Sequence, residues 1–125
     1  MIFVAPARHA PGTYMDWLAK QRCICCGVYG VILHHLTAWG LPRKLRNPLR
    51  CYTVVPICTW HHDDTGDRHA AHRMQQDAWL AHWGHQDLDA LLLAQYRAYA
   101  RAHALALPQG LTAREAAAWL LERER

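Results

Sequence analysis

Two pairs of metal-ligand side chains constrain the fold of this chain more than any other feature. Cys23 and Cys26 form a Cys-x-x-Cys pair, and Cys58 and His61 form a Cys-x-x-His pair further along the chain. Each spacing allows a short turn to present two ligands to one tetrahedral zinc ion. A lone Cys-x-x-Cys pair would equally suit a redox dithiol. The second pair favours a structural zinc site.

The remaining cysteines leave one alternative open. Cys25 could replace one of the paired cysteines, whereas Cys51 lies among strand-like residues and is expected to be buried. The odd total of five cysteines and a start too short for a signal peptide argue against a disulfide framework. No apolar run approaches the roughly 20 residues of a membrane-spanning helix. We therefore expect a cytoplasmic protein with reduced thiols and no membrane partner.

Sequence patterns predict an α+β fold, mostly helical by residue count, in a single domain over 1–125. Residues rich in β-formers predict strands at 28–33 and 51–57, joined through a loop at 36–50. Apolar residues at helical spacing predict helices at 13–21, 68–83, 86–104 and from 112 onward. Capping boxes begin two of these helices, at Thr13 to Asp16 and at Thr112 to Glu115, and Gly84 ends a third.

Positive charge is concentrated in one part of the chain. The net charge is +4, and no acidic residue occurs between Asp16 and Asp63. That window contains six basic residues: Lys20, Arg22, Arg43, Lys44, Arg46 and Arg50. Such a distribution favours a polyanionic partner such as nucleic acid, although a solvated loop that happens to lack acids would look the same.

Two histidine doublets exceed what a structural zinc site requires. The doublets are His34 with His35 and His61 with His62, and zinc needs only His61. Adjacent residues on an extended strand point to opposite sides, so His34 and His35 are expected to play different roles. One imidazole could bind a metal while its neighbour faces a substrate water.

The order of these motifs resembles a known family of nucleases. A Cys-x-x-Cys-Gly turn, a His-His pair, a basic glycine-containing loop and the segment from Val55 to His62 (VPICTWHH) follow one another. This order is similar to that of HNH endonucleases, and most similar to the RecA-dependent recombination-enhancement nucleases of phages. The resemblance implies a zinc-stapled ββα-metal core, also called a His-Me finger, over about residues 15–83. A helical extension over about 85–125 matches nothing in that family.

The resemblance also implies roles for individual residues. His35 takes the place of the general base, and His34 and His62 take the places of ligands of the catalytic metal. His69 fits the position of a further ligand, although His69 and His72 could equally form an exposed helix face. Four basic residues are expected to grip DNA phosphates without reading sequence: Arg43, Lys44, Arg46 and Arg50.

One position departs from the family pattern. The residues before the Cys-x-x-His pair include Tyr52 and Thr53, where the family carries the Asn of its signature. Backbone groups or Thr53 would have to substitute for that Asn, which orients the base. The resemblance favours Mg²⁺ or Mn²⁺ as the catalytic metal, whereas a site made only of imidazoles also suits Zn²⁺ or Ni²⁺.

The sequence therefore predicts a phage or prophage HNH-type DNA endonuclease of low sequence specificity, with a role in recombination or DNA processing. Its expected partners are DNA and, through the resemblance, a RecA filament. The alternatives are a non-catalytic zinc-finger module that binds DNA or a recombinase, and a degenerate nuclease that keeps only the fold.

Overall fold

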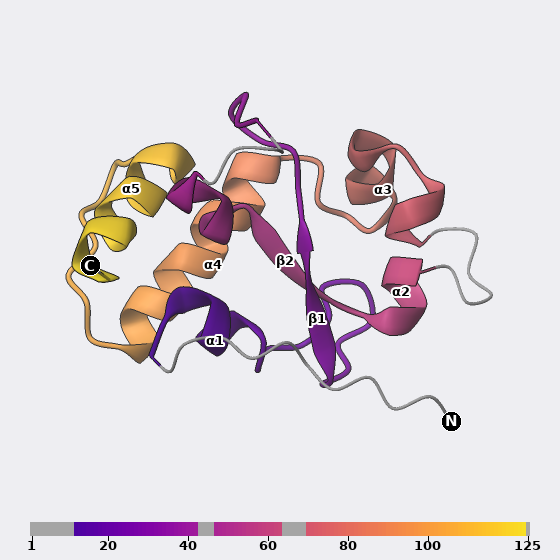
Figure 1. The fold of residues 1–125 in the computed structure, drawn as a ribbon, viewed down its shortest axis with the longest axis horizontal. Helices are drawn as coiled ribbons and strands as arrows, with labels where there is room; N and C mark the ends of the chain where they lie inside the picture. The colour runs from indigo at the N-terminus through magenta and orange to yellow at the C-terminus, as the bar shows by residue number, and fades with distance from the viewer. Residues whose placement is uncertain (1–11, 43–46, 64–69, 125) are drawn as a thin grey trace.

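A two-stranded sheet lies between two groups of helices in the computed structural model, which describes residues 12–42, 47–63 and 70–124. Helices α1, α4 and α5 lie on one side of the sheet, and α2 and α3 lie on the other (Figure 1). This mixed architecture of helices and a small sheet agrees with the α and β content expected from the sequence. The elements, in chain order, are α1 (Tyr14–Leu18), β1 (Val31–His35), the 3₁₀ helix η1 (Pro48–Tyr52), β2 (Val54–Cys58), α2 (Thr59–Asp63), the 3₁₀ helix η2 (Ala71–Arg73), α3 (Gln76–His82), α4 (Leu88–Ala102) and α5 (Ala113–Glu124).

The register of the sheet brings the two ligand pairs together. Strands β1 and β2 are antiparallel, with Val31 opposite Cys58 and His35 opposite Val54. The Cys-x-x-Cys pair precedes β1 and the Cys-x-x-His pair begins at the last residue of β2. Because the start of one antiparallel strand lies beside the end of the other, both pairs meet at one end of the sheet.

The strands differ in position from those expected, and the expectation of a buried Cys51 is wrong. Residues 51 and 52 belong to η1 rather than to a strand, and Cys51 is exposed. The Asn47 side chain accepts a hydrogen bond of 3.0 Å from the Leu49 N–H, and Pro48 occupies the first helical position. This cap and proline start a helical turn in place of a strand.

Helix ends follow the sequence signals closely. The Thr13 hydroxyl accepts from the Asp16 N–H at 3.2 Å, and Thr112 and Glu115 exchange two side-chain-to-backbone bonds of 2.9 and 3.1 Å. Gly84 follows α3 with a φ of 84°, a conformation that glycine adopts without strain.

The helix expected at 68–83 is shorter than predicted. The described part of that range contains η2 and then α3, separated by extended backbone at Met74 with φ −129° and ψ 152°. Residues 64–69 lie outside the described residues. The helix predicted from the spacing of apolar residues is confirmed over α3, which buries Trp79 and Leu80.

Stacked tyrosines join η1 to the helices on its side of the sheet. The rings of Tyr14 and Tyr52 stack with centroids 4.9 Å apart, and Tyr96 meets both of them edge-on. The Tyr96 hydroxyl donates a hydrogen bond to the Tyr52 carbonyl. All three side chains are fully buried. This cluster fixes η1 against α1 and α4.

Removing the Tyr96 hydroxyl tests the importance of that bond. We expect Tyr96→Phe to lower the free energy of unfolding by about 1–3 kcal/mol, because the buried Tyr52 carbonyl loses its donor. Chemical denaturation measures the change. Tyr29→Phe is the matched control, since the Tyr29 side chain is 65% exposed. Equal stability of the two variants would contradict the prediction.

Candidate metal centres

Three sulfur atoms and one imidazole converge at the end of the sheet. Cys23, Cys26, Cys58 and His61 each offer one ligand atom, and all four atoms lie within 4.8 Å of one another. The Cys26 and Cys58 sulfurs are 3.8 Å apart, and Cys58 Sγ lies 3.1 Å from His61 Nδ1. Ligands around one tetrahedral zinc ion lie roughly 3.3–3.8 Å apart, given the usual Zn–N and Zn–S distances. This Cys₃His cluster, predicted from spacing, could therefore hold a structural metal such as zinc.

A tight turn presents the first cysteine pair. The Gly27 N–H donates to the Cys23 carbonyl at 2.9 Å, and Gly27 has a φ of 79° that an L side chain would strain. The Cys25 N–H donates to Cys23 Sγ at 3.3 Å. The Ile24 N–H donates to the Pro56 carbonyl at 3.0 Å, which attaches the turn to β2. Cys25 therefore supports the ligand Cys23 and is not itself one of the four grouped ligands.

Two thiols of the cluster, those of Cys23 and Cys58, have pKa values shifted in opposite directions. A hydrogen bond from the Cys25 side chain lowers the pKa of Cys23, which favours its thiolate. Burial raises the pKa of Cys58. A bound cation would favour the thiolate at both positions, and metal binding would release protons. Acid is therefore expected to weaken metal binding at this cluster.

Three histidines form a separate group. His34 on β1, His62 on α2 and His72 on η2 each offer a ring nitrogen, and these atoms lie within 4.8 Å of one another. The centroids of the His62 and His72 rings are 4.2 Å apart, and those of His34 and His62 are 5.1 Å apart. Imidazole nitrogen is a common ligand of divalent transition metals. We call this group the tri-histidine cluster.

A side-chain clamp explains why η2 returns to the sheet. The Gln76 side-chain oxygen accepts a hydrogen bond of 2.7 Å from the Thr37 N–H. The side-chain nitrogen of Gln76 donates another of 2.7 Å to the Thr37 carbonyl. Thr37 lies two residues beyond the end of β1, and Gln76 begins α3 three residues after the end of η2. The clamp therefore holds His72 beside the strand that carries His34.

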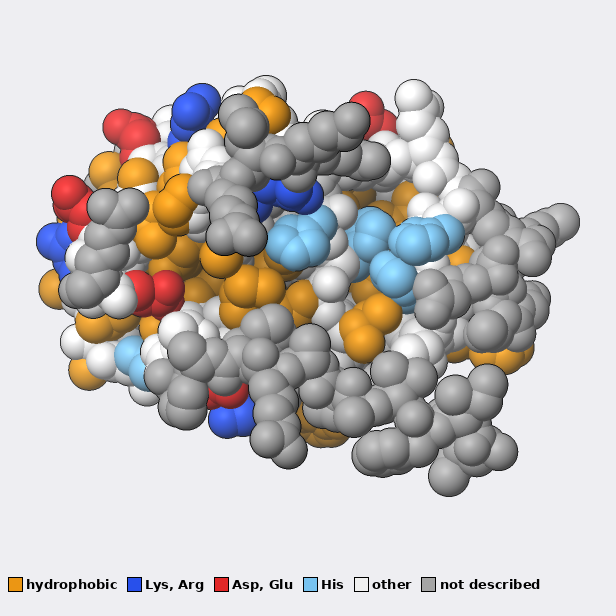
Figure 2. Space-filling model, viewed as in Figure 1, with side chains coloured by type: hydrophobic (Ala, Val, Ile, Leu, Met, Phe, Trp, Pro, Cys, Tyr) orange, Lys and Arg blue, Asp and Glu red, His pale blue; other side chains and the backbone are white. Residues whose placement is uncertain are grey.

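An open cavity of about 530 Å³ lies against this cluster. Its wall is formed by His34, His35, Arg50 and His72. His35 is exposed at the end of β1, whereas His34 is half-buried in the cluster. Figure 2 shows histidine side chains gathered across the visible face, with a basic side chain next to them. The two neighbours in the first doublet thus differ in burial, yet both line one cavity.

The structure gives His72 a place that the sequence did not. The sequence predicts for His72 only an exposed helix face shared with His69, and His69 lies outside the described residues. So do three of the predicted phosphate-binding residues: Arg43, Lys44 and Arg46. The sequence signal for His72 was weak, because nothing in a local pattern shows that η2 folds back onto β1.

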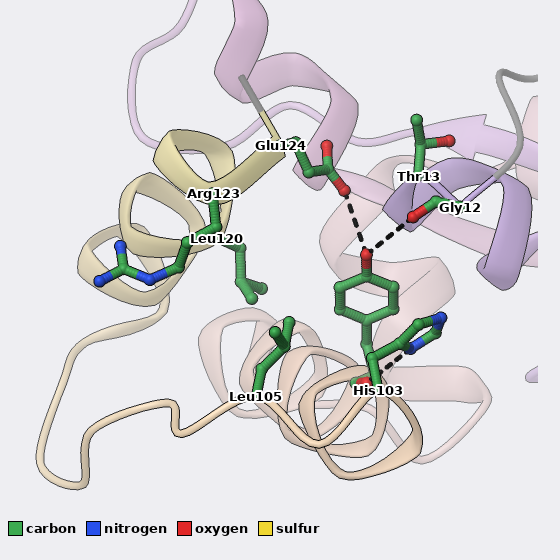
Figure 3. A pocket seen from close by; sticks show the side chains of 8 residues that line it. Gly12, Thr13, His103, Leu105, Leu120, Arg123 and Glu124 are labelled. Atoms are coloured by element: carbon green, nitrogen blue, oxygen red, sulfur yellow. Dashed lines mark hydrogen bonds between the residues drawn. The ribbon is translucent and has the colours of Figure 1, made fainter.

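Another cavity, of about 430 Å³, lies near the carboxyl end of the chain. Several of its polar groups already bond to one another, around the Tyr99 side chain (Figure 3). The Tyr99 hydroxyl lies 3.2 Å from the Gly12 carbonyl and 3.4 Å from Glu124 Oε1, which also accepts from the Tyr14 N–H at 2.6 Å. Burial raises the pKa of Tyr99 to about 12, so its hydroxyl stays protonated at neutral pH. The hydrogen bonds around this cavity connect α1, α4 and α5 to one another.

Comparisons with known proteins give one match. A family model described as "Protein of unknown function (DUF968)" matches residues 5–98. No curated protein and no solved structure matches the chain. The matched range contains the Cys₃His cluster, the tri-histidine cluster and the cavity, and it ends before α5. No described helix is long and apolar enough to cross a membrane.

Proposed function

We propose that this chain, which belongs to the DUF968 family of proteins of unknown function, is a metal-dependent HNH-type DNA endonuclease. The observation that carries the proposal is the shared cavity of His34, His35, Arg50 and His72. It combines a solvent-facing imidazole, two members of a potential metal site and a guanidinium. Catalysis of phosphodiester hydrolysis calls for a base, a cation and a phosphate-binding group at one place.

The order of elements supports a ββα-metal core. Strands β1 and β2 are followed directly by α2, and the Cys₃His cluster joins the start of β1 to the start of α2. The tri-histidine cluster draws one ligand from β1 and one from α2. A structural metal would hold these elements in place while the second metal site carries the chemistry. The two clusters thus divide three of the five cysteines and four of the ten histidines between a structural and a catalytic role.

The proposed reaction is hydrolysis of a phosphodiester bond. His35 takes a proton from a water molecule, and the resulting hydroxide forms a bond to phosphorus as the bond to the 3′ oxygen breaks. The leaving oxygen takes a proton from solvent, which gives 5′-phosphate and 3′-hydroxyl ends. A divalent cation held by the tri-histidine cluster would act as a Lewis acid on the phosphoryl oxygens. Three neutral imidazoles favour Mn²⁺, Ni²⁺ or Zn²⁺ over Mg²⁺, which prefers oxygen ligands.

The second candidate is a non-catalytic zinc module that binds DNA or a recombinase. Such a module would need the Cys₃His cluster and basic residues, but it would gain nothing from the tri-histidine cluster or from an exposed His35 beside it. These surplus imidazoles favour the nuclease over the module.

Cleavage of supercoiled plasmid tests the proposal. The purified protein is incubated with plasmid and Mg²⁺, Mn²⁺, Ni²⁺ or Zn²⁺, with and without a RecA filament on single-stranded DNA. We expect nicked circles that depend on added metal and disappear with a chelator. The absence of metal-dependent cleavage under all of these conditions would overturn the assignment in favour of the binding module.

Metal titration distinguishes His72 from His69 as the third ligand. We expect His72→Ala to weaken binding of the second metal by at least about tenfold, because even a partner behind a ligand contributes about that much. Titration calorimetry with Mn²⁺ on zinc-loaded protein measures the affinity. His82→Ala, which removes an exposed histidine outside the tri-histidine cluster, is the control. A large loss with His69→Ala and none with His72→Ala would contradict the prediction.

A further inference from the structure

Arg50 is the one predicted phosphate-binding residue that lies among the described residues. It is carried by η1, and it shares one cavity wall with the general base proposed above and with two members of the tri-histidine cluster. The four described residues that line this cavity are three histidines and Arg50. A phosphate in the cavity would therefore meet the positive charge of the Arg50 guanidinium.

We propose that Arg50 binds the scissile phosphate itself, and that Thr53 is a positioning residue that holds Arg50 at the cavity. This inference rests on the proposed nuclease function and assigns a substrate contact within that site. The guanidinium presents two parallel N–H groups that match two oxygens of one phosphate. Held between the tri-histidine cluster and Arg50, the phosphate would expose its phosphorus to water activated by His35.

Thr53 connects Arg50 to the base through the backbone. Its side chain is 1% exposed. The Thr53 hydroxyl lies 3.3 Å from the Arg50 carbonyl, and the Thr53 N–H lies 3.4 Å from the same oxygen, so both groups donate to it. The Thr53 carbonyl accepts from the Leu36 N–H at 2.7 Å, directly after His35.

These bonds set the spacing between the two groups that would act on substrate. The hydroxyl and N–H of Thr53 bond to Arg50 near the end of η1, and its carbonyl bonds to Leu36, directly after the end of β1. The neighbouring Tyr52 carbonyl is bonded to Tyr96, which prevents η1 from shifting along α4. Loss of the Thr53 hydroxyl would loosen Arg50 without removing any group that touches substrate.

A contact to the scissile phosphate and a contact to a flanking phosphate have different kinetic signatures. A flanking contact contributes equally to the ground state and the transition state, so its loss raises KM. A contact to the reacting phosphate strengthens as charge develops on the phosphoryl oxygens, so its loss lowers kcat. We therefore expect Arg50→Ala to lower kcat by about 10²–10³-fold with little change in KM. Arg50→Lys is expected to recover part of that loss, because one charge remains without the planar fork.

The expected effect of Thr53→Val is smaller and depends on Arg50. We expect kcat to fall about tenfold, because a displacement of a positioned group by about 1 Å can cost up to a hundredfold. Thr53→Ser, which keeps the hydroxyl, should restore kcat. In an Arg50→Ala background, Thr53→Val should have no further effect on kcat, since its action passes through Arg50.

The experiment measures kcat and KM for plasmid nicking in Mn²⁺ by the wild type, these variants and the Arg50→Ala/Thr53→Val double variant. Circular dichroism and zinc content verify that each variant is folded. Arg101→Ala, an exposed residue at the end of α4, controls for the loss of one positive charge.

Four outcomes separate the proposals. Absence of wild-type cleavage refutes the nuclease and this inference together. A cleaving wild type with a raised KM and an unchanged kcat in Arg50→Ala leaves the nuclease intact and refutes the scissile-phosphate role. An equal loss from Thr53→Val in both backgrounds refutes its positioning role. Both roles are supported if Arg50→Ala lowers kcat and Thr53→Val, which lowers kcat in the wild type, has no further effect in the Arg50→Ala background.

Discussion

Replacement of His35 by alanine is expected to reduce plasmid cleavage by about 10²–10⁴-fold, the usual contribution of a positioned general base. The change should leave both metals bound, because His35 belongs neither to the Cys₃His cluster nor to the tri-histidine cluster. The folded state should also persist, since the His35 side chain is exposed at the end of β1. Initial rates of nicking at saturating Mn²⁺ measure the loss, and metal analysis and circular dichroism establish that fold and metals are retained.

Added imidazole gives a second measurement on the same variant. An exposed position beside an open cavity of about 530 Å³ admits a small base from solution. We therefore expect imidazole to restore part of the activity of His35→Ala and to leave a His34→Ala variant inactive, because the latter loses a metal ligand. Equal cleavage by the wild type and His35→Ala would show that another group activates water.

Replacement of Cys58 by serine is expected to unfold the protein. Cys58 ends β2 and His61 lies in α2, and their ligand atoms lie 3.8 and 3.9 Å from the sulfurs of Cys26 and Cys23, which precede β1. Binding of zinc at such a site releases about 10–16 kcal/mol in zinc-finger peptides, which is comparable to the whole net stability of a domain, about 5–15 kcal/mol. The loss of one thiolate should therefore remove cooperative thermal unfolding along with bound zinc.

Cys51→Ser is the matched control, because it removes a thiol that is exposed and belongs neither to the Cys₃His cluster nor to the tri-histidine cluster. Melting followed by circular dichroism, together with zinc analysis, measures both variants. A chelator added to the wild type should reproduce the loss of structure. If Cys58→Ser melts cooperatively with one zinc per chain, Cys58 is not a ligand, and Cys25 becomes the residue to test next.

Local sequence signals predicted the features that depend on neighbouring residues. The capping boxes at Thr13 and Thr112 form as expected, because a side chain and a backbone N–H three residues away need no tertiary contact to meet. The four residues of the Cys₃His cluster also followed from spacing, because each pair lies within one turn. The prediction of a strand beginning at Cys51 is wrong for a local reason that the sequence contains, because Asn47 and Pro48 start η1 there instead.

Long-range placement could not be predicted in this way. His72 lies beside His34 and His62 through tertiary contacts such as the clamp of Gln76 on the backbone of Thr37, which joins residues 39 positions apart. Arg50 reaches the cavity because stacked tyrosines and Thr53 hold η1 at the end of the sheet. The amino-acid sequence by itself determined which residues can bind a metal and where helices begin. Only the tertiary structure decided which imidazoles share a centre and which basic residue lies beside it, because packing between distant segments sets those distances.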